Sequence, residues 1–161
     1  MLAAPLPDNE RERLAALRAL LILDTPPEER FDRITAFAAQ EFAVPIATIS
    51  LVDAERQWFK SRVGLDVCET GRDESFCAHA ILQDAILVIP DALADPRFAD
   101  NPLVTGAPHI RFYAGAQLRL ADGSKPGTLC LIDRVTRQLD SVELAILASL
   151  RQLVEEELHA R

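Results

Sequence analysis

The sequence has little of the chemistry that metal sites, disulfide frameworks and membrane spans require. Its 161 residues include only three cysteines and three histidines. No CxxC or HxxxH pair occurs, so no metal site is expected. The three cysteines are odd in number and irregularly spaced, so no disulfide framework is expected. No apolar run approaches the ~20 residues that span a bilayer, so we expect no contact with a membrane.

Basic charge is also scarce. The chain has 17 Lys and Arg against 25 Asp and Glu, a formal net charge of −8. A protein that binds a phosphate backbone needs clustered Lys and Arg, so we expect no nucleic-acid partner. The first residues, MLAAPLPDNERER, lack the charge-then-apolar order of a secretory signal. A cytoplasmic protein with reduced thiols is the simplest interpretation.

Helical patterns occupy the N-terminal part of the chain, residues 9–44. Asn9 followed by Glu12 predicts a cap for a first helix, whose leucines recur at helical spacing. The segment DTPPEE predicts the start of a second helix, with Thr25 as the cap and Glu28 completing a capping box. We therefore expect two helices before the first strand.

A last helix is predicted over residues 140–161. Asp140 with Glu143 predicts its capping box. Its apolar seam comprises Leu147, Leu150, Val154 and Leu158. Because the seam continues almost to Arg161, it indicates either a contact with a second copy and an onward signalling helix, or packing against an N-terminal helix.

Five segments between the helices have the patterns of strands. They are residues 45–53, 58–64, 85–92, 110–120 and 128–133. Their tight connections imply an antiparallel sheet, and helices at both ends of the sequence predict an α+β fold with one face covered by helices. The residues between 65 and 108, here called the excursion, should cover the other face.

The excursion is the least regular part of the sequence. Its segment SFCAHAILQ predicts a short helix, and residues 93–108 read as a structured loop with one more short helix. Loops longer than about 12 residues are uncommon in compact domains and are often functional. A functional role for this loop is therefore expected.

Several motifs in this order resemble a GAF domain of the bacterial type that precedes sensor histidine kinases and diguanylate cyclases. They are LDTPPEERFDRIT, VPIATISLVD, RQWFKSRVGLD, ESFCAHAIL, VIPDALADPRFADNPLV, IRFYAGAQL and GTLCLID. The resemblance implies one domain over residues 1–161, with a sheet of five or six strands in 45–134. It also implies terminal helices on one face and a small-molecule pocket on the other.

What the resemblance implies for function is a non-catalytic sensor. Such domains bind varied small molecules, commonly dimerise through their terminal helices and pass a signal to a kinase or cyclase placed after them. We expect a homodimer and an unidentified small-molecule ligand, with no cofactor. A ligand-free dimerisation module is an alternative.

Alternation along residues 110–120 places Arg111 and Tyr113 toward the excursion, if the apolar side packs on the helices. Arg111 suits a carboxylate or phosphate on a ligand. Alternatively it anchors the 93–108 loop by pairing with Asp91, Asp95 or Asp100. The expected ligand-binding residues are Trp58, Arg62, Phe76, His79, Asp91, Arg111 and Tyr113.

The stretch FCAHAIL first suggests a catalytic pair of Cys77 and His79. On a helix, positions two apart point about 200° apart, so these two side chains cannot share one face. The apolar neighbours favour a packing role for Cys77. His79 is expected either to bond a loop carbonyl or to line the mouth of the pocket.

An enzymatic alternative comes from the free methionine-(R)-sulfoxide reductases, which the chain also resembles in length and in its three cysteines. Cys68 and Cys77 lie close to the first thiol pair of that family. The family's remaining catalytic cysteine should follow VIPDALADP, and the sequence has none there. Cys130 lies instead in a buried strand. This departure disfavours the reductase activity.

Overall fold

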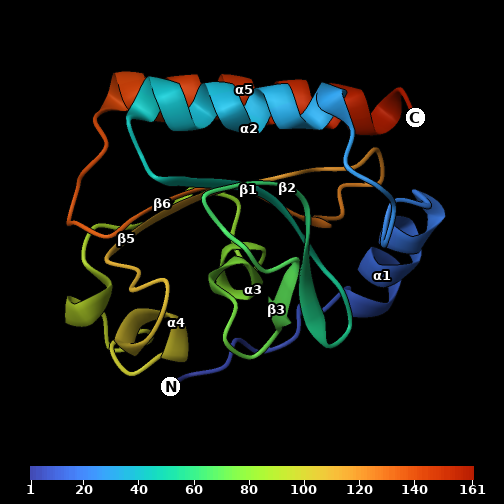
Figure 1. The fold of residues 1–161 in the computed structure, drawn as a ribbon. Coiled ribbons are helices and arrows are strands. Elements are labelled where there is room, and N and C mark those ends of the chain that lie inside the picture. The colour runs from blue at the N-terminus through green and yellow to red at the C-terminus, as the bar shows by residue number, and fades with distance from the viewer.

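A six-stranded antiparallel sheet forms the centre of the molecule in the computed structural model, which describes residues 1–161 (Figure 1). Its strand order is β3-β2-β1-β6-β5-β4. The strands are β1 (Ile46–Val52), β2 (Arg56–Val63), β3 (Glu69–Gly71), β4 (Leu87–Ile89), β5 (Phe112–Gln117) and β6 (Gly127–Asp133). The predicted α+β class and antiparallel pairing are confirmed.

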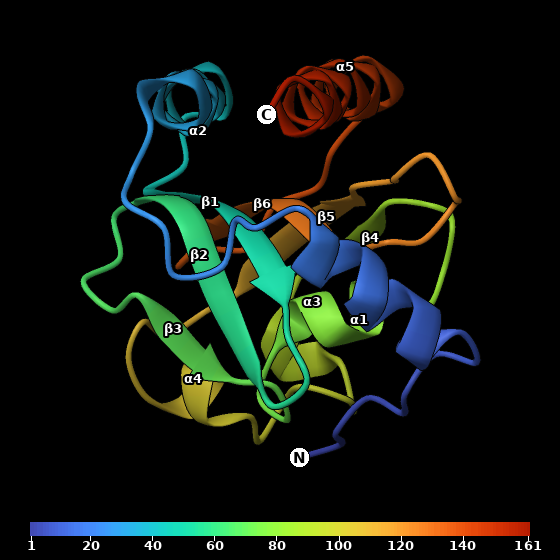
Figure 2. The ribbon, with the colours of Figure 1, turned by 90° about the vertical axis from the view of Figure 1, so that its right-hand side faces the viewer.

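One face of the sheet is covered by α2 (Glu29–Phe42) and α5 (Ser141–His159), which lie side by side (Figures 1 and 2). The core beneath them includes Phe31, Ile34, Ala38, Ile49, Leu51, Trp58, Phe112, Ala114, Leu129 and Leu131. The first helix, α1 (Glu10–Ala19), is not part of this layer but lies beside the sheet. The expected helical layer is therefore made by α2 and α5.

The apolar seam of α5 is used within the chain. Leu147, Leu150, Val154 and Leu158 all belong to the core beneath the helices. This packing accounts for the seam, and the homodimer stays a prediction. The capping box of Asp140 and Glu143 is formed, as expected. None of the helices has the length and the apolar composition needed to cross a bilayer.

The excursion covers the opposite face, as predicted, with three short helices. These are α3 (Phe76–Ala80), the 3-10 helix η1 (Ala92–Ala94) and α4 (Pro102–Thr105). A second core fills the space beneath them, with the rings of Phe76 and Phe98 stacked 4.1 Å apart. The excursion also supplies both edge strands, β3 and β4.

Two helix starts differ from prediction. The side chain of Asn9 makes no capping hydrogen bond on α1. Helix α2 begins at Glu29, later than predicted, because the preceding turn is bound elsewhere. Thr25 Oγ1 donates to the Ile22 carbonyl and also accepts a hydrogen bond of 2.8 Å from Lys60 Nζ. These contacts draw the turn onto the sheet before the helix begins.

A bulge in β2 changes which face its last residues present. Ser50 pairs with Phe59, whereas Ile49 pairs with Ser61, so Lys60 is an extra residue. An extra residue interrupts the period-two alternation of a strand. Arg62 therefore pairs with Thr48 and does not share the side of Trp58 as the sequence predicted.

Candidate functional site

A cavity of about 370 Å³ lies between the sheet and the excursion. Small-molecule sites typically have volumes of roughly 300–1,000 Å³. The sheet contributes Thr48, Ser50, Gln57, Phe59, Tyr113, Cys130 and Ile132 to its lining. The excursion contributes Leu65, Phe76, Cys77, Leu103 and Pro108, among others. The cavity thus has the size of a ligand site and is enclosed by the segment that sequence analysis marked as functional.

The sheet side of the cavity carries a cluster of hydroxyls and thiols. The Sγ atoms of Cys77 and Cys130 lie 3.2 Å apart. Tyr113 donates from its hydroxyl to Cys77 Sγ at 3.2 Å, and Thr128 Oγ1 donates to the same sulfur at 2.9 Å. Both hydroxyls also lie within reach of Cys130 Sγ, at 3.4 and 2.7 Å. We call Cys77, Cys130, Tyr113 and Thr128 the thiol cluster.

The two thiols of this cluster differ in acidity. Burial raises the pKa of Cys77 well above its usual value, and the neighbouring Cys130 raises it further. Burial also raises the pKa of Cys130, but hydrogen bonds from Cys77, Thr128 and Tyr113 outweigh it and lower that pKa to about 6. The hydrogen bonds therefore favour the charged form of Cys130, whereas burial favours the protonated form of Cys77.

The mouth of the cavity is acidic. Asp66, Glu69 and Glu74 line it, and Arg134 is the one basic residue among the lining side chains. Asp66, Glu69 and Arg134 are exposed, which places the opening at this side. Solutes therefore enter past carboxylates and reach a floor of hydroxyls and thiols.

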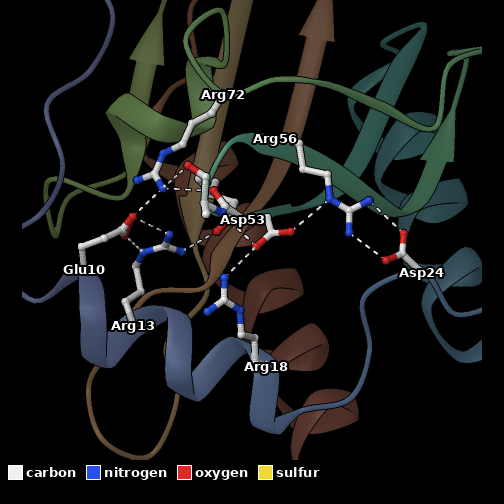
Figure 3. A network of polar contacts seen from close by, with 9 residues as sticks. Glu10, Arg13, Arg18, Asp24, Asp53, Arg56 and Arg72 are labelled. Carbon is white, nitrogen blue, oxygen red and sulfur yellow. Dashed lines mark hydrogen bonds and ion pairs between the residues drawn. The ribbon is translucent and has the colours of Figure 1, made fainter.

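A polar network beside the cavity fixes α1 against the rest of the molecule (Figure 3). Arg72, four residues before α3, pairs with Glu10 and donates to the Asp53 carbonyl at 3.0 Å. Glu10 also accepts a hydrogen bond of 2.6 Å from buried Arg13, which in turn donates to the Val52 carbonyl at 2.7 Å. The network joins α1, the β1–β2 turn and the entry to α3.

Only Phe76 and Tyr113, of the seven expected ligand-binding residues, line the cavity. Trp58 packs in the core under the helices, and its neighbour Phe59 lines the cavity in its place. The bulge at Lys60 turns Arg62 to the cavity face of the sheet, but Arg62 is exposed and does not line the cavity.

Arg111 anchors the loop, although through a different partner from those predicted. Its guanidinium donates to the carbonyl of Val104 at 2.9 Å. The aspartates are engaged elsewhere: Asp91 accepts from the Leu93 amide, and Asp95 pairs with Arg97. The remaining aspartate, Asp100, pairs with the N-terminal ammonium group.

His79 does not line the cavity. Its Nε2 lies 3.0 Å from the carbonyl oxygen of Leu2, and its ring meets Phe98 edge-on. Of the two expected roles, the structure supports a hydrogen bond to a backbone carbonyl, here that of Leu2, and not a place at the mouth of the pocket. Cys77, expected as a packing residue, is buried, but its sulfur belongs to the thiol cluster.

Sequence reasoning missed the polar residues of β1 and the partner of Cys77. The β-branched and apolar content of segment 45–53 predicts a strand that is apolar on both faces, although Thr48 and Ser50 alternate with Ala47, Ile49 and Leu51. That alternation was the available signal. Cys130 was expected to be buried in a strand, which is correct, but nothing local pointed to its contact with Cys77. Cys68 is exposed.

Comparison with known proteins gives a family, a longer relative and similar folds. The model of the family described as GAF domain matches residues 26–158. A cyclic di-GMP phosphodiesterase of Pseudomonas aeruginosa is 44% identical over 160 residues, which is 99% of this chain and 27% of that protein. The chain therefore spans about a quarter of the length of this curated relative.

Solved structures share the fold at low sequence identity. The GAF domain of a phosphoenolpyruvate-protein phosphotransferase from Coxiella burnetii has a TM-score of 0.68 at 16% identity, covering 96% of this chain and 97% of that one. A free methionine-R-sulfoxide reductase from Neisseria meningitidis, solved with its substrate, has a TM-score of 0.67 at 18% identity, covering 99% and 96%.

Proposed function

We propose that this chain, which belongs to the GAF domain family, is a non-catalytic sensory domain that binds a small molecule in the cavity beneath the excursion. The observation that carries the proposal is the cavity of about 370 Å³, with apolar walls and a polar floor. Apolar walls provide affinity, and a few placed polar groups orient a ligand.

The sheet supplies a route from the cavity to the helices. In β1, Thr48 and Ser50 line the cavity while Ile49 and Leu51 pack beneath the helices. In β6, Cys130 and Ile132 line the cavity and Leu131 packs beneath the helices. A ligand that shifts either strand therefore displaces the floor on which α2 and α5 rest. It changes the equilibrium only if it binds the two states with different affinity.

The partner of this sensor is an output domain in the same polypeptide. The relative from P. aeruginosa is nearly four times as long as the matched region, and it is a cyclic di-GMP phosphodiesterase. We infer that the chain serves bacterial cyclic di-GMP signalling or a related two-component pathway, in the cytoplasm. Exposed Phe37 on α2 and Leu153 on α5 suit a helix-mediated homodimer.

Native mass spectrometry of the protein purified from its own host tests the binding function. A reproducible bound mass is expected. The Leu103→Trp variant, which fills the cavity from α4, should lose that mass, whereas Leu93→Trp, on an exposed side chain outside the cavity, should keep it. A wild-type protein that carries no mass, or a mass retained by Leu103→Trp, contradicts the proposal and favours a ligand-free dimerisation module.

A second candidate is a free methionine-(R)-sulfoxide reductase activity. It is favoured by one observation, that Cys77 lines the cavity in a fold shared with such a reductase. Incubation with free methionine-(R)-sulfoxide and a thiol reductant separates the two functions. A sensor gives no turnover, whereas turnover that Cys77→Ser abolishes would establish the enzyme.

A further inference from the structure

We propose that Cys77 and Cys130 form a redox-active dithiol, which a small hydroperoxide entering the cavity oxidises to a disulfide that joins α3 to β6. The inference goes beyond the proposed sensory function, because it concerns covalent chemistry of the cavity floor and does not require a reversibly bound ligand. It also differs from the sulfoxide reductase alternative, which used Cys68 and Cys77.

Geometry is the first support. The two cysteines are 53 positions apart in sequence, and their sulfur atoms meet at 3.2 Å. A disulfide needs about 2.05 Å between sulfurs, so closure requires an approach of little more than 1 Å. Both side chains are almost fully buried and both line the cavity. A small solute can reach them only through that cavity.

The chemical environment is the second support. A thiolate is the nucleophile in reactions of cysteine, and hydrogen-bond donors stabilise it. The hydroxyls of Tyr113 and Thr128 each lie within hydrogen-bond distance of both sulfurs, so each can turn its one hydrogen toward the sulfur that is charged. These donors let Cys130 carry negative charge although it is buried, while Cys77 keeps a proton that can be transferred.

The reaction with a hydroperoxide ROOH balances as follows. The thiolate sulfur of Cys130 attacks the distal oxygen, an S–O bond forms, and the O–O bond breaks. Cys130 becomes a sulfenic acid, and the leaving alkoxide takes the thiol proton of Cys77 to become ROH. The new Cys77 thiolate attacks the sulfenic sulfur, forming the S–S bond and expelling hydroxide, which takes a proton from solvent as water.

The site selects oxidants by size. Cys68 is exposed and meets any thiol reagent, whereas Cys77 and Cys130 are enclosed. Hydrogen peroxide and small alkyl hydroperoxides fit a cavity of about 370 Å³, but the much larger glutathione disulfide must enter past the acidic mouth. We therefore expect oxidation of the buried pair by small peroxides and not by glutathione disulfide.

Oxidation has a structural consequence for the roof of the cavity. Helix α3 carries Cys77 and Phe76, while β6 is a central strand next to β1. A disulfide fastens this part of the excursion to the sheet and removes the thiolate from the cavity floor. Oxidised protein should therefore resist thermal unfolding more than reduced protein does.

The test is peptide mapping of the reduced whole chain after treatment with a small excess of hydrogen peroxide. The expected product is a linked pair of peptides that contain Cys77 and Cys130. The Cys68→Ser variant, the matched control for an exposed thiol, should give the same linked product at the wild-type rate. The Cys77→Ser variant should stop at the sulfenic acid on Cys130, trapped by dimedone.

Two results would overturn the proposal. One is that peroxide modifies Cys68 while Cys77 and Cys130 keep free thiols. The other is that Cys77→Ser accumulates no more dimedone adduct at Cys130 than the wild type does. If Cys77→Ser does not fold, the wild-type and Cys68→Ser maps still decide, because the linked peptides are either formed or absent.

Discussion

The ring of Tyr113 lies over Gly115, two residues along the same strand. A methyl group built on Gly115 would lie 2.7 Å from Cζ of Tyr113 and closer still to its hydroxyl oxygen. Residue 115 also pairs across the sheet with Cys130. The absent side chain at position 115 thus gives the phenol the space in which it reaches both thiols.

We predict that Gly115→Ala destabilises the protein by about 1–3 kcal/mol, because overpacking a filled site displaces its neighbours. Urea unfolding measures the free energy of unfolding. The same substitution in a Tyr113→Leu background should cost clearly less, since the ring that it meets is gone. An equal cost in the two backgrounds would show that the contact with Tyr113 is not the cause.

Arg13 is expected to contribute far more to the free energy of unfolding than Arg11, which lies on the same helix, α1. Its side chain is 1% exposed, and it joins Glu10 to the Val52 carbonyl (Figure 3). Arg13→Met should lower the free energy of unfolding by about 3 kcal/mol, since Glu10 and the carbonyl lose their buried donor. Arg11→Met, at an exposed position, is the matched control and should leave the urea midpoint nearly unchanged. Similar midpoints for both variants would refute this role.

His79 is predicted to make stability depend on pH. Burial lowers its pKa, against the opposing effects of the Leu2 carbonyl and of Asp95, while Arg97 lowers it further. Because the folded pKa lies below the unfolded one, folding disfavours the proton. The stability from the neutral ring is present above the ordinary value of about 6.5 and is lost as pH falls toward the folded pKa.

A variant without the ring isolates this effect. His79→Gln keeps a side-chain donor for the Leu2 carbonyl and does not titrate. The urea midpoint is measured at about pH 7.5 and at about pH 5.5, on either side of the ordinary histidine pKa. It should decrease more between these two pH values for the wild type than for the variant. The same fall in both proteins would mean that other groups cause the acid sensitivity.

The elements that could be predicted are those whose signals are local in sequence. Alternation along residues 110–120 found β5 and placed Tyr113 toward the excursion, and Asp140 with Glu143 found the start of α5. The edge strand β4 lies within the predicted strand 85–92, whereas the edge strand β3 was not predicted, because its three residues depend on pairing with β2. Such pairing leaves no periodic signal.

The candidate site was harder to predict because long-range packing sets it. The bulge at Lys60 depends on pairing between β1 and β2, and it moved Arg62 to the face opposite Trp58. The contact of Cys77 with Cys130 joins a helix to a strand 53 positions away. Arg111 was correctly expected to anchor the loop as one alternative, but its carbonyl partner depends on the path of the loop.

The acidity of Cys130 gives the last prediction. Burial raises its pKa, but the hydrogen bonds from Cys77, Thr128 and Tyr113 bring it down to about 6. The rate of Cys130 alkylation by iodoacetamide should therefore rise as pH increases through about 6 and level off before pH 8. Tyr113→Phe removes one donor to the thiolate, so the midpoint of the profile should move to higher pH. Cys68 in the same samples is the internal control, and its profile should not change with Tyr113→Phe.

A Cys130 midpoint that stays in place in Tyr113→Phe would exclude the phenol as a donor to the charged sulfur. Because a purely structural loss would change the rate at every pH, only a shifted midpoint identifies the hydrogen bond.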